Sequence, residues 1–556
     1  PISVLPKGGI LYFTQYSVAQ YDFRGTAQYN TVLGGKHTIN VLGGMEASKV
    51  QRHQEAFQGW GIVYNNGRLP FTRHELFKQM QEENGSYFSD QFGNTRNLAY
   101  FGTGTYSFMG RYMLVGTLRY EGSNKMGKTR QSRWLPTWNV SAGWNIYEEP
   151  WFKKWSGNKY LSYAKLRASY SLTAESGPSS YANAEALYYP SRPWRQESDA
   201  QELGLAISAL ANSDLTYEKK HELDLGVDLG FLGNRLNLVF DWYKRNNFDL
   251  IGRMYNSGVG GFSTKFGNVA EMSAHGVEFT ISSRNITNDS HERNGVTWTT
   301  DFTFSYAKNT ITKLQSRSTV MNLVQSSGFA KEGYPQRAIF SIPFVGLNSH
   351  GIPQFLSPTG EVVTTDINFQ DWENTGYLKY EGPVDAPYTG GFGNNVTWRG
   401  FHLNVFLTYA FGNKVRLTPT FAAAYSDLTA MPKEFKNRWV MPGDEAYTDV
   451  PVIASRRQYY ADRQLSRAYS AYNYSTARVA NGDFIRLKEV SVTYDIPAVI
   501  LHALKLTSAS VKLATTNLCL LYADKKLNGQ DPEFFNSGGV ASPNPKQFTF
   551  TLRFGL

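Results

Sequence analysis

The stretch Asn481–Pro497, NGDFIRLKEVSVTYDIP, decides the fold class, because its side chains alternate strictly from Lys488 onward. Every second residue is apolar, and this row consists of Val490, Val492, Tyr494 and Ile496. Successive strand residues point to opposite sides, so the pattern predicts a strand with one dry face and one wet face. It leaves open whether the apolar face forms the core of a soluble sandwich or faces lipid around a transmembrane barrel.

Length and hydropathy favour the barrel. A soluble chain of 556 residues would divide into several cores joined by linkers, and no Pro/Ser-rich linker, charge run or composition shift marks such a joint. No stretch approaches the roughly 20 apolar residues that a helical membrane span needs. The mean hydropathy of −0.41 is compatible with a barrel, since only alternate strand residues must be apolar there.

Aromatic residues and charge narrow the class further. The chain has 35 Tyr, 35 Phe and 12 Trp, and such rings suit the membrane–water interface, although an aromatic-rich soluble glycan-binding protein remains an alternative. Lys and Arg outnumber acidic residues by 10, but they are dispersed singly along the chain. No basic segment of the kind that binds phosphate backbones is present, so we expect no nucleic acid as a partner. The mild positive charge suits a barrel among anionic lipids, so we expect outer-membrane lipids as partners. The single cysteine, Cys519, excludes an internal disulfide and any cysteine-based zinc cluster.

Short hairpins recur along the chain. The alternating segments Leu223–Phe231 and Leu236–Trp242 flank a Gly233–Asn234 turn, whose residues readily adopt the positive φ of a tight hairpin. We expect similar turns around Met109–Arg111 and Trp398–Gly400. The pattern as a whole predicts roughly fifteen strands, several of them about ten residues long, enough to cross a bilayer with tilt.

The other connections are long. They are Gly59–Thr95, Thr173–Thr216, Leu314–Ala338, Phe411–Ala480 and Leu521–Pro545. Structureless loops of this length are unusual in compact soluble domains, whereas outer-membrane barrels combine short periplasmic turns with long external loops. The last strand, Lys546–Leu556, alternates Phe and Leu with polar residues and resembles the terminal strand of such barrels. The sequence therefore predicts an all-β fold, a large antiparallel transmembrane β-barrel with long extracellular loops.

Six segments resemble, in order, those of the SusC/RagA-like family of TonB-dependent outer-membrane transporters. They are Arg133–Glu148, Lys165–Tyr170, Asn212–Lys219, Asn268–Phe279, Gly482–Leu487 and Asn517–Glu533. The resemblance implies a barrel of about 22 strands around a plug, preceded by a carboxypeptidase-like domain and a TonB box. None of these N-terminal parts is recognisable, so we expect 1–556 to be the C-terminal part of the barrel. An open sheet edge is not viable in lipid, so the missing strands should precede Pro1.

The resemblance also implies a function. It points to active import of oligosaccharides or oligopeptides across the Gram-negative outer membrane, coupled to TonB through the missing N-terminal part. A SusD-like surface lipoprotein is the implied partner. The alternatives are a passive porin and a SusC-like barrel that serves as a structural scaffold in a larger outer-membrane complex.

No catalytic or metal site is expected. The sequence lacks HExxH, GxSxG, P-loop and GxGxxG motifs, so we expect no enzyme activity and no cofactor. The histidines show no metal-ligand spacing, and we expect His53, His74 and His275 in loops or the lumen. The pairs Glu148–Glu149 and Asp444–Glu445 could bind calcium, but solvated loop carboxylates are the favoured interpretation.

Substrate contacts are expected from aromatic residues of the long loops and the lumen, because rings stack on sugars and clasp peptide side chains. The candidates are Trp60, Tyr64, Tyr188, Tyr189, Trp194, Trp372 and Trp439. The alternative for each is packing within its own loop. Tyr188–Arg195 and Arg456–Tyr460 have the Tyr, Trp and Arg content of interface hot spots, so we expect them to contact a partner.

Overall fold

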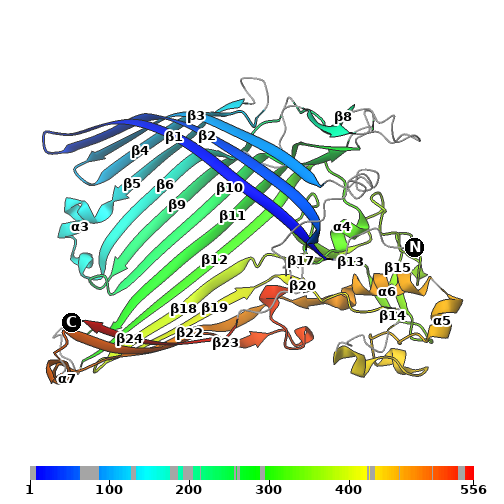
Figure 1. Cartoon of the computed structure of the whole chain (residues 1–556). Helices are drawn as coiled ribbons and strands as arrows, with labels where there is room; N and C mark the ends of the chain where they lie inside the picture. Colours follow the sequence, from blue (N-terminus) through cyan, green and yellow to red (C-terminus); the bar gives the residue numbers. More distant parts are fainter. Residues whose placement is uncertain are drawn as a thin grey trace.

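One curved antiparallel sheet of 15 strands dominates the computed structural model (Figure 1). The structure describes residues 8–62, 87–126, 133–175, 186–191, 204–212, 215–255, 258, 263–287, 295–422, 425, 433–462, 464–503, 505–535 and 545–555. The strands pair in chain order, and their bounds are β1 (Gly9–Leu33), β2 (His37–Ile62), β3 (Phe88–Phe108), β4 (Tyr112–Ser123), β5 (Trp134–Asn145), β6 (Leu161–Glu175), β9 (Glu218–Phe231), β10 (Leu236–Tyr255), β11 (Thr264–Ile286), β12 (Val296–Leu314), β18 (Tyr388–Trp398), β19 (Phe401–Phe411), β22 (Phe484–Asp495), β23 (Ser508–Ala523) and β24 (Gln547–Gly555). The prediction of an all-β fold with about fifteen strands is confirmed.

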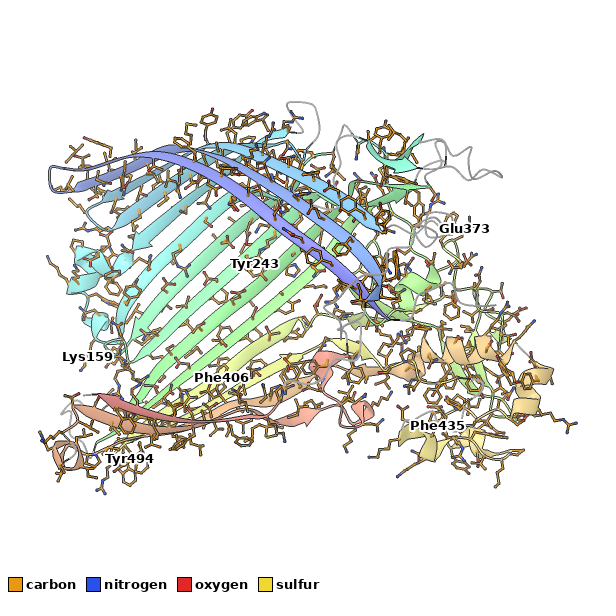
Figure 2. The ribbon with its side chains drawn as sticks, viewed as in Figure 1. Lys159, Tyr243, Glu373, Phe406, Phe435 and Tyr494 are labelled. Carbon is orange, nitrogen blue, oxygen red and sulfur yellow. The ribbon has the colours of Figure 1, made fainter. Side chains whose placement is uncertain are left out.

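The register confirms the predicted alternation of faces. One row across β9, β10, β11 and β12 is apolar and contains Val227, Phe240, Phe279 and Phe304. The adjacent row on the opposite face contains Gly226, Asp241, Glu278 and Ser305. We call the first face the lipid face and the second the lumen face. Figure 2 shows side chains projecting from both faces of the wall.

Strand β22, which lies within Asn481–Pro497, contains a β-bulge. The pairing of β22 with β23 shifts by one residue between Leu487 and Glu489. The pairing of β22 with β19 shifts at the same place, because Leu487 and Glu489 face the consecutive residues Leu407 and Phe406. The extra residue, Lys488, resets the alternation, so Leu487 and Val490 both lie on the lipid face. This is why strict alternation starts only at Lys488, and it leaves Arg486 on the lumen face.

The two ends of the sheet differ. Tight turns join strands at one end, which we call the turn end, on the left in Figure 1. The predicted turns are confirmed there, with φ angles of 68° at Gly233, 62° at Asn234, 50° at Arg399 and 82° at Gly400. The long connections leave the opposite edge, the loop end. The loop expected over Gly59–Thr95 is shorter than predicted, because β2 continues to Ile62 and β3 begins at Phe88.

Two long connections are folded, contrary to the expectation of structureless loops. Residues 315–387 and 412–483, here called the loop module, share one hydrophobic core that includes Phe340, Phe355, Tyr469 and Tyr472. The first connection runs well beyond the predicted limit at Ala338. The elements of the module are α4 (Val320–Val324), β13 (Ala338–Ser341), β14 (Phe344–Leu347), β15 (Pro353–Leu356), β16 (Val362–Val363), β17 (Lys379–Pro383), β20 (Lys414–Arg416), η5 (Lys433–Asn437), η6 (Asp444–Ala446), α5 (Arg456–Ala461), α6 (Leu465–Asn473), η7 (Thr476–Arg478) and β21 (Val479–Asn481).

Smaller elements complete the description. At the loop end they are the hairpin of β7 (Leu187–Ser191) and β8 (Gly204–Ala209), with η8 (Lys525–Leu527) and η9 (Pro532–Phe534). At the turn end they are η2 (Ile146–Glu148), α3 (Pro150–Lys154), η3 (Ser156–Lys159) and α7 (Ala498–Ala503). None of the helices in the described part of the chain combines the length and the apolar character that a membrane span requires.

Candidate functional site

A polar pocket of about 450 Å³ lies in the lumen face near the loop end. Strands β3 to β6 and the residues before β9 supply its walls, and Asn97, Arg119, Glu121, Glu175 and Tyr217 are among the lining residues. The guanidinium of Arg119 donates from Nε to Glu121 at 2.6 Å. Charged groups and amides on a rigid wall can hydrogen-bond the hydroxyls of a sugar or the amides of a peptide.

The polar wall continues beyond this pocket. A second pocket of about 320 Å³ shares Asn97, Arg119 and Glu121 with the first. In it, Arg119 Nη1 lies 2.7 Å from Glu46, and Arg24 Nε lies 3.3 Å from the other oxygen of that carboxylate. The two pockets therefore form one surface with alternating positive and negative charge, here called the lumen wall site.

The lumen wall site was missed by sequence reasoning. Arg119 and Glu121 stand two positions apart on one strand, which places them on the same face. Glu46 lies 73 residues from Arg119 in sequence, and only the pairing of the strands brings the two together. The available signal was a pair of opposite charges at neighbouring lumen positions of a predicted strand.

The predicted aromatic residues lie in different places. Tyr188 and Tyr189 are exposed on β7, with exposed fractions of 60% and 49%. Trp60 is buried near the end of β2. The Trp372 ring stacks under the guanidinium of Arg317, with the Arg317 Cζ atom 3.9 Å from the ring centroid.

The remaining candidates divide between an enclosed residue and two that lie outside the described residues. Trp439 is buried, and its indole N–H donates to Glu445 at 2.8 Å. The same ring lies against Gly351 of the other connection in the loop module. Trp439 therefore packs within the module, as the alternative interpretation expects. Tyr64 and Trp194 lie outside the described residues.

Two of the sequence motifs are joined by a buried ion pair. Arg486 Nη2 lies 2.6 Å from both carboxylate oxygens of Asp531 and 2.6 Å from Glu533. The Arg486 side chain is only 5% exposed. The pair fastens the connection after β23 to the lumen face of β22, so these motifs anchor a loop.

A second anchor joins two other motifs. The Asn268 side chain donates to the carbonyl of Thr216 at 2.9 Å and accepts from the Thr216 N–H at 3.0 Å. It also donates to the carbonyl of Asp249 at 2.5 Å. The Glu218 carboxylate accepts from the N–H of Ile251 at 2.7 Å. The segment before β9 is thereby fixed at the rim of the lumen wall site.

The prediction of solvated carboxylates is wrong for Glu149. Its side chain is buried, accepts from the hydroxyl of Tyr112 at 2.6 Å and from the indole of Trp144 at 3.1 Å, and faces Arg111 at 3.5 Å. Glu148 instead pairs with Lys153 at 2.5 Å.

The second carboxylate pair is also engaged by its own loop. Asp444 accepts from the N–H groups of Met441 and Val440, and these bonds lower the pKa of its carboxyl. Glu445 accepts from the Trp439 indole and the Gly443 N–H, each at 2.8 Å. Both carboxylates thus stabilise a turn of the loop module.

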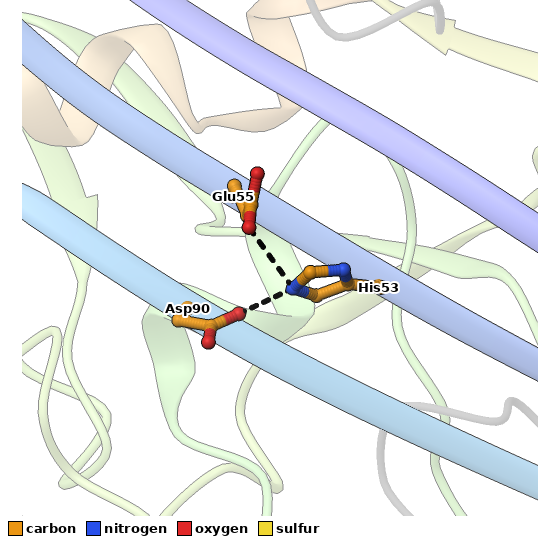
Figure 3. A group of neighbouring side chains, drawn as sticks. All are labelled: His53, Glu55 and Asp90. Atoms are coloured by element: carbon orange, nitrogen blue, oxygen red, sulfur yellow. Dashed lines mark hydrogen bonds and ion pairs between the residues drawn. The ribbon is translucent and has the colours of Figure 1, made fainter.

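One group of side chains has donors that could ligate a metal ion (Figure 3). His53 Nε2 lies 2.6 Å from Asp90 and 3.6 Å from Glu55, and the His53 ring stacks on Phe92 with centroids 4.1 Å apart. An imidazole nitrogen and two carboxylates are donors that a divalent ion accepts.

The expected location of the histidines is corrected by the strand register. His53 lies on β2 and His275 on β11, both on the face away from the lumen rather than in a loop or the lumen. His74 lies outside the described residues. Spacing along the chain could not reveal the group in Figure 3, because Asp90 lies 37 residues from His53.

Comparisons with known proteins agree with this architecture. Residues 6–423 match the family described as TonB dependent receptor-like, beta-barrel. TonB-dependent receptor P3 of Formosa agariphila is 27% identical over 541 residues, which cover 93% of this chain and 50% of that protein. TonB-dependent receptor SusC of Bacteroides thetaiotaomicron is 25% identical over 321 residues, which cover 56% of this chain and 30% of that protein.

The same fold occurs among solved structures. The structure of the RagAB peptide transporter superposes with a TM-score of 0.77 at 22% identity, covering 98% of this chain and 56% of that chain. The chain spans about half the length of the curated relatives that it matches over most of its sequence. The predicted family and location are confirmed, and the soluble alternative is excluded. This chain belongs to the TonB dependent receptor-like β-barrel family and is an outer-membrane protein of the SusC/RagA type.

Proposed function

We propose that this chain forms the barrel wall of an importer that moves oligosaccharides or oligopeptides across the outer membrane with energy supplied through TonB. The lumen wall site is the observation that carries the proposal, because it presents paired charges and amides close to the loop end. Membership of the family supports the energy coupling. As part of the proposal, residues 1–556 are the C-terminal portion of the barrel, and the plug and TonB-contacting segment belong to another part of the protein.

The substrate class is an oligomer whose hydrogen-bonding groups match the lumen wall site. RagAB is described as a peptide transporter, and that likeness concerns the fold. Both glycans and peptides carry the donors and acceptors that Arg119, Glu121 and Asn97 would pair. We retain the exposed Tyr188, Tyr189 and Trp372 as candidate substrate contacts, together with Tyr64 and Trp194. Trp60 at the end of β2 is buried, as Trp439 is, and is not retained.

A SusD-like surface lipoprotein is the proposed partner. Apolar and aromatic side chains at the loop end favour a protein contact there, because exposed patches of this kind mark interfaces. Leu205 on β8 is 75% exposed beside the tyrosines of β7, and Tyr447 in the loop module is 92% exposed. Purification of the complex in mild detergent should recover the lipoprotein, and repeated elution of the barrel alone would remove this part of the proposal.

Uptake by cells that produce the full-length protein tests the function. Fluorescent oligopeptides and oligosaccharides are supplied with and without a functional TonB system, and uptake of one class should require TonB. Glu121→Gln should raise the half-saturating concentration about tenfold, because a charge-assisted hydrogen bond is lost. Glu278→Gln is the matched control, since Glu278 occupies the lumen face of β11 outside the pocket.

The other outcomes distinguish the alternatives. Uptake that continues without TonB would identify a passive porin. No uptake of either class, with the chain recovered in a stable envelope complex, would identify a scaffold subunit.

A further inference from the structure

The connection between β5 and β6 folds back onto the lipid face at the turn end. Phe152 in α3 is its anchor, being only 3% exposed. The rings of Trp151 and Trp155 lie 5.8 Å and 6.0 Å from the Phe152 ring, centroid to centroid. These two tryptophans remain exposed by 56% and 48%. In Figure 1 the segment, which includes α3, lies at the left margin of the sheet.

This segment borders an open, shallow apolar pocket of about 520 Å³ against the sheet. Trp151, Phe152 and Trp155 line one side, and Ala164 of β6 and Leu229 of β9 form part of the floor. Ala164 and Leu229 are register partners, and each stands two residues from a lipid-face residue of its strand. The pocket is therefore continuous with the surface that the barrel presents to lipid.

The height of the pocket is indicated by neighbouring aromatic residues. Phe108, Tyr112 and Trp144 form a row on the lipid face of the turn end, with ring centroids 6.5 Å and 6.2 Å apart. Such rows mark the level of the lipid headgroups. The segment of α3 follows Trp144 directly, so the pocket lies where acyl chains meet headgroups.

The charge at the rim suits an anionic headgroup. Lys154 lines the otherwise apolar pocket and is exposed. The acidic residues of the segment are already engaged, because Glu148 pairs with Lys153 and Glu149 is buried against Tyr112. A phosphate beside Lys154 would therefore meet a cation without a competing carboxylate from these two residues.

We propose that this pocket is a binding site for a glycerophospholipid of the leaflet at the turn end. One acyl chain occupies the apolar pocket between α3 and the floor formed by Ala164 and Leu229, and the phosphate lies at Lys154. Trp151 and Trp155 border the acyl chain at headgroup depth. A membrane lipid is the fitting occupant because the pocket opens from the lipid-facing surface. The proposal does not depend on the substrate or the transport mechanism.

The test uses the full-length protein in vesicles of phosphatidylethanolamine and phosphatidylglycerol, followed by mild delipidation and native mass spectrometry. Wild type should retain a phospholipid. Lys154→Gln should lower the retention of phosphatidylglycerol about fivefold, the factor for one lysine near a lipid surface. Lys159→Gln is the matched control, because Lys159 is exposed in the same segment but does not line the pocket.

A second variant separates the pocket from surface charge. Ala164→Phe fills the floor with an apolar side chain and should abolish retention of both lipids, while heat-modifiable gel migration reports an intact barrel. Equal retention by wild type, Lys154→Gln and Ala164→Phe would overturn the site. Retention that follows only the headgroup charge and survives Ala164→Phe would also overturn it, because the pocket would then hold no acyl chain.

Discussion

At the scale of single residues, Arg486 anchors a loop to the barrel wall. It connects the lumen face of β22 to Asp531 and Glu533, and it is almost completely buried. Arg486→Ala would leave Asp531, which is 11% exposed, without its cation. We expect a loss of about 3 kcal/mol in the free energy of unfolding, measured by urea titration in vesicles.

The matched control for that variant is Arg337→Ala. Arg337 pairs with Asp385 at 2.6 Å, but the two side chains are 40% and 58% exposed. Exposed pairs of this kind contribute less than about 1 kcal/mol. Equal destabilisation by the two variants would show that the pair at Arg486 does not anchor the loop.

Single positions of the last strand test the assignment of the faces. Leu552 pairs with Val511 on the lipid face, and Thr551 pairs with Lys512 on the lumen face. Leu552→Arg should lower the free energy of unfolding in the bilayer by about 2–4 kcal/mol if the position lies at mid-depth. Thr551→Arg should destabilise the barrel clearly less, because its side chain enters the lumen. The only added cost there is repulsion by the neighbouring Lys512. A folding assay in which the two variants behave alike would contradict the assignment.

At the scale of elements, regular strands were predictable and folded connections were not. Alternation in Leu223–Phe231 and Leu236–Trp242 identifies β9 and β10 because lipid and lumen impose a period of two. The bulge at Lys488 is visible in sequence only as the point where alternation starts. The core of the loop module joins residues as distant as Phe340 and Tyr469, and no local period encodes such a contact.

The orientation of the connections stays a prediction, and surface labelling tests it. With Cys519→Ser as background, a membrane-impermeant maleimide should label Tyr447→Cys on intact cells, because Tyr447 is 92% exposed at the loop end. Asn234→Cys at the turn end should react only after the outer membrane is permeabilised. Labelling of Asn234→Cys on intact cells would reverse the topology.

The loop module should also respond to alkali as a unit. Burial raises the pKa of Tyr377 to about 12, and burial also raises the pKa of Tyr469 and of Tyr472. These phenols bind their protons more tightly in the folded state than in the unfolded state. Their contribution to the free energy of unfolding is therefore complete below pH ~10 and is lost as the pH rises through the pKa values of the folded state. Tyrosinate absorbance should therefore lag behind that of free tyrosine. Titration of all tyrosines near pH ~10 would contradict a packed module.

At the scale of the whole molecule, the family and the barrel wall could be predicted, but the candidate site could not. Six ordered segments carry the family resemblance, and the structure shows that several of them anchor loops, as Asn268 does with Thr216. The lumen wall site depends on distances across strands, such as that between Arg119 and Glu46, which sequence alone does not supply. The aromatic content of the loops pointed to candidate residues. It could not show that some of them, such as Trp439, are enclosed by their own loop.

Spin labels along β19 test the central claim most directly, that one face of this wall meets lipid and the other a watery lumen. Positions 402–408 are replaced singly by cysteine in the Cys519→Ser background of the full-length protein and labelled with a nitroxide in vesicles. Phe406 is the informative residue, because it is apolar yet shares the lumen face with Asn404, packed over Gly391 and Gly393.

Collisions with oxygen should peak at Leu403, Val405 and Leu407, and collisions with a water-soluble nickel complex should peak at Asn404, Phe406 and Thr408. This period of two, with Phe406 in phase with the polar positions, is the predicted result. Collision profiles without alternation, or with oxygen highest at Asn404 and Thr408, would contradict a transmembrane barrel with a polar lumen.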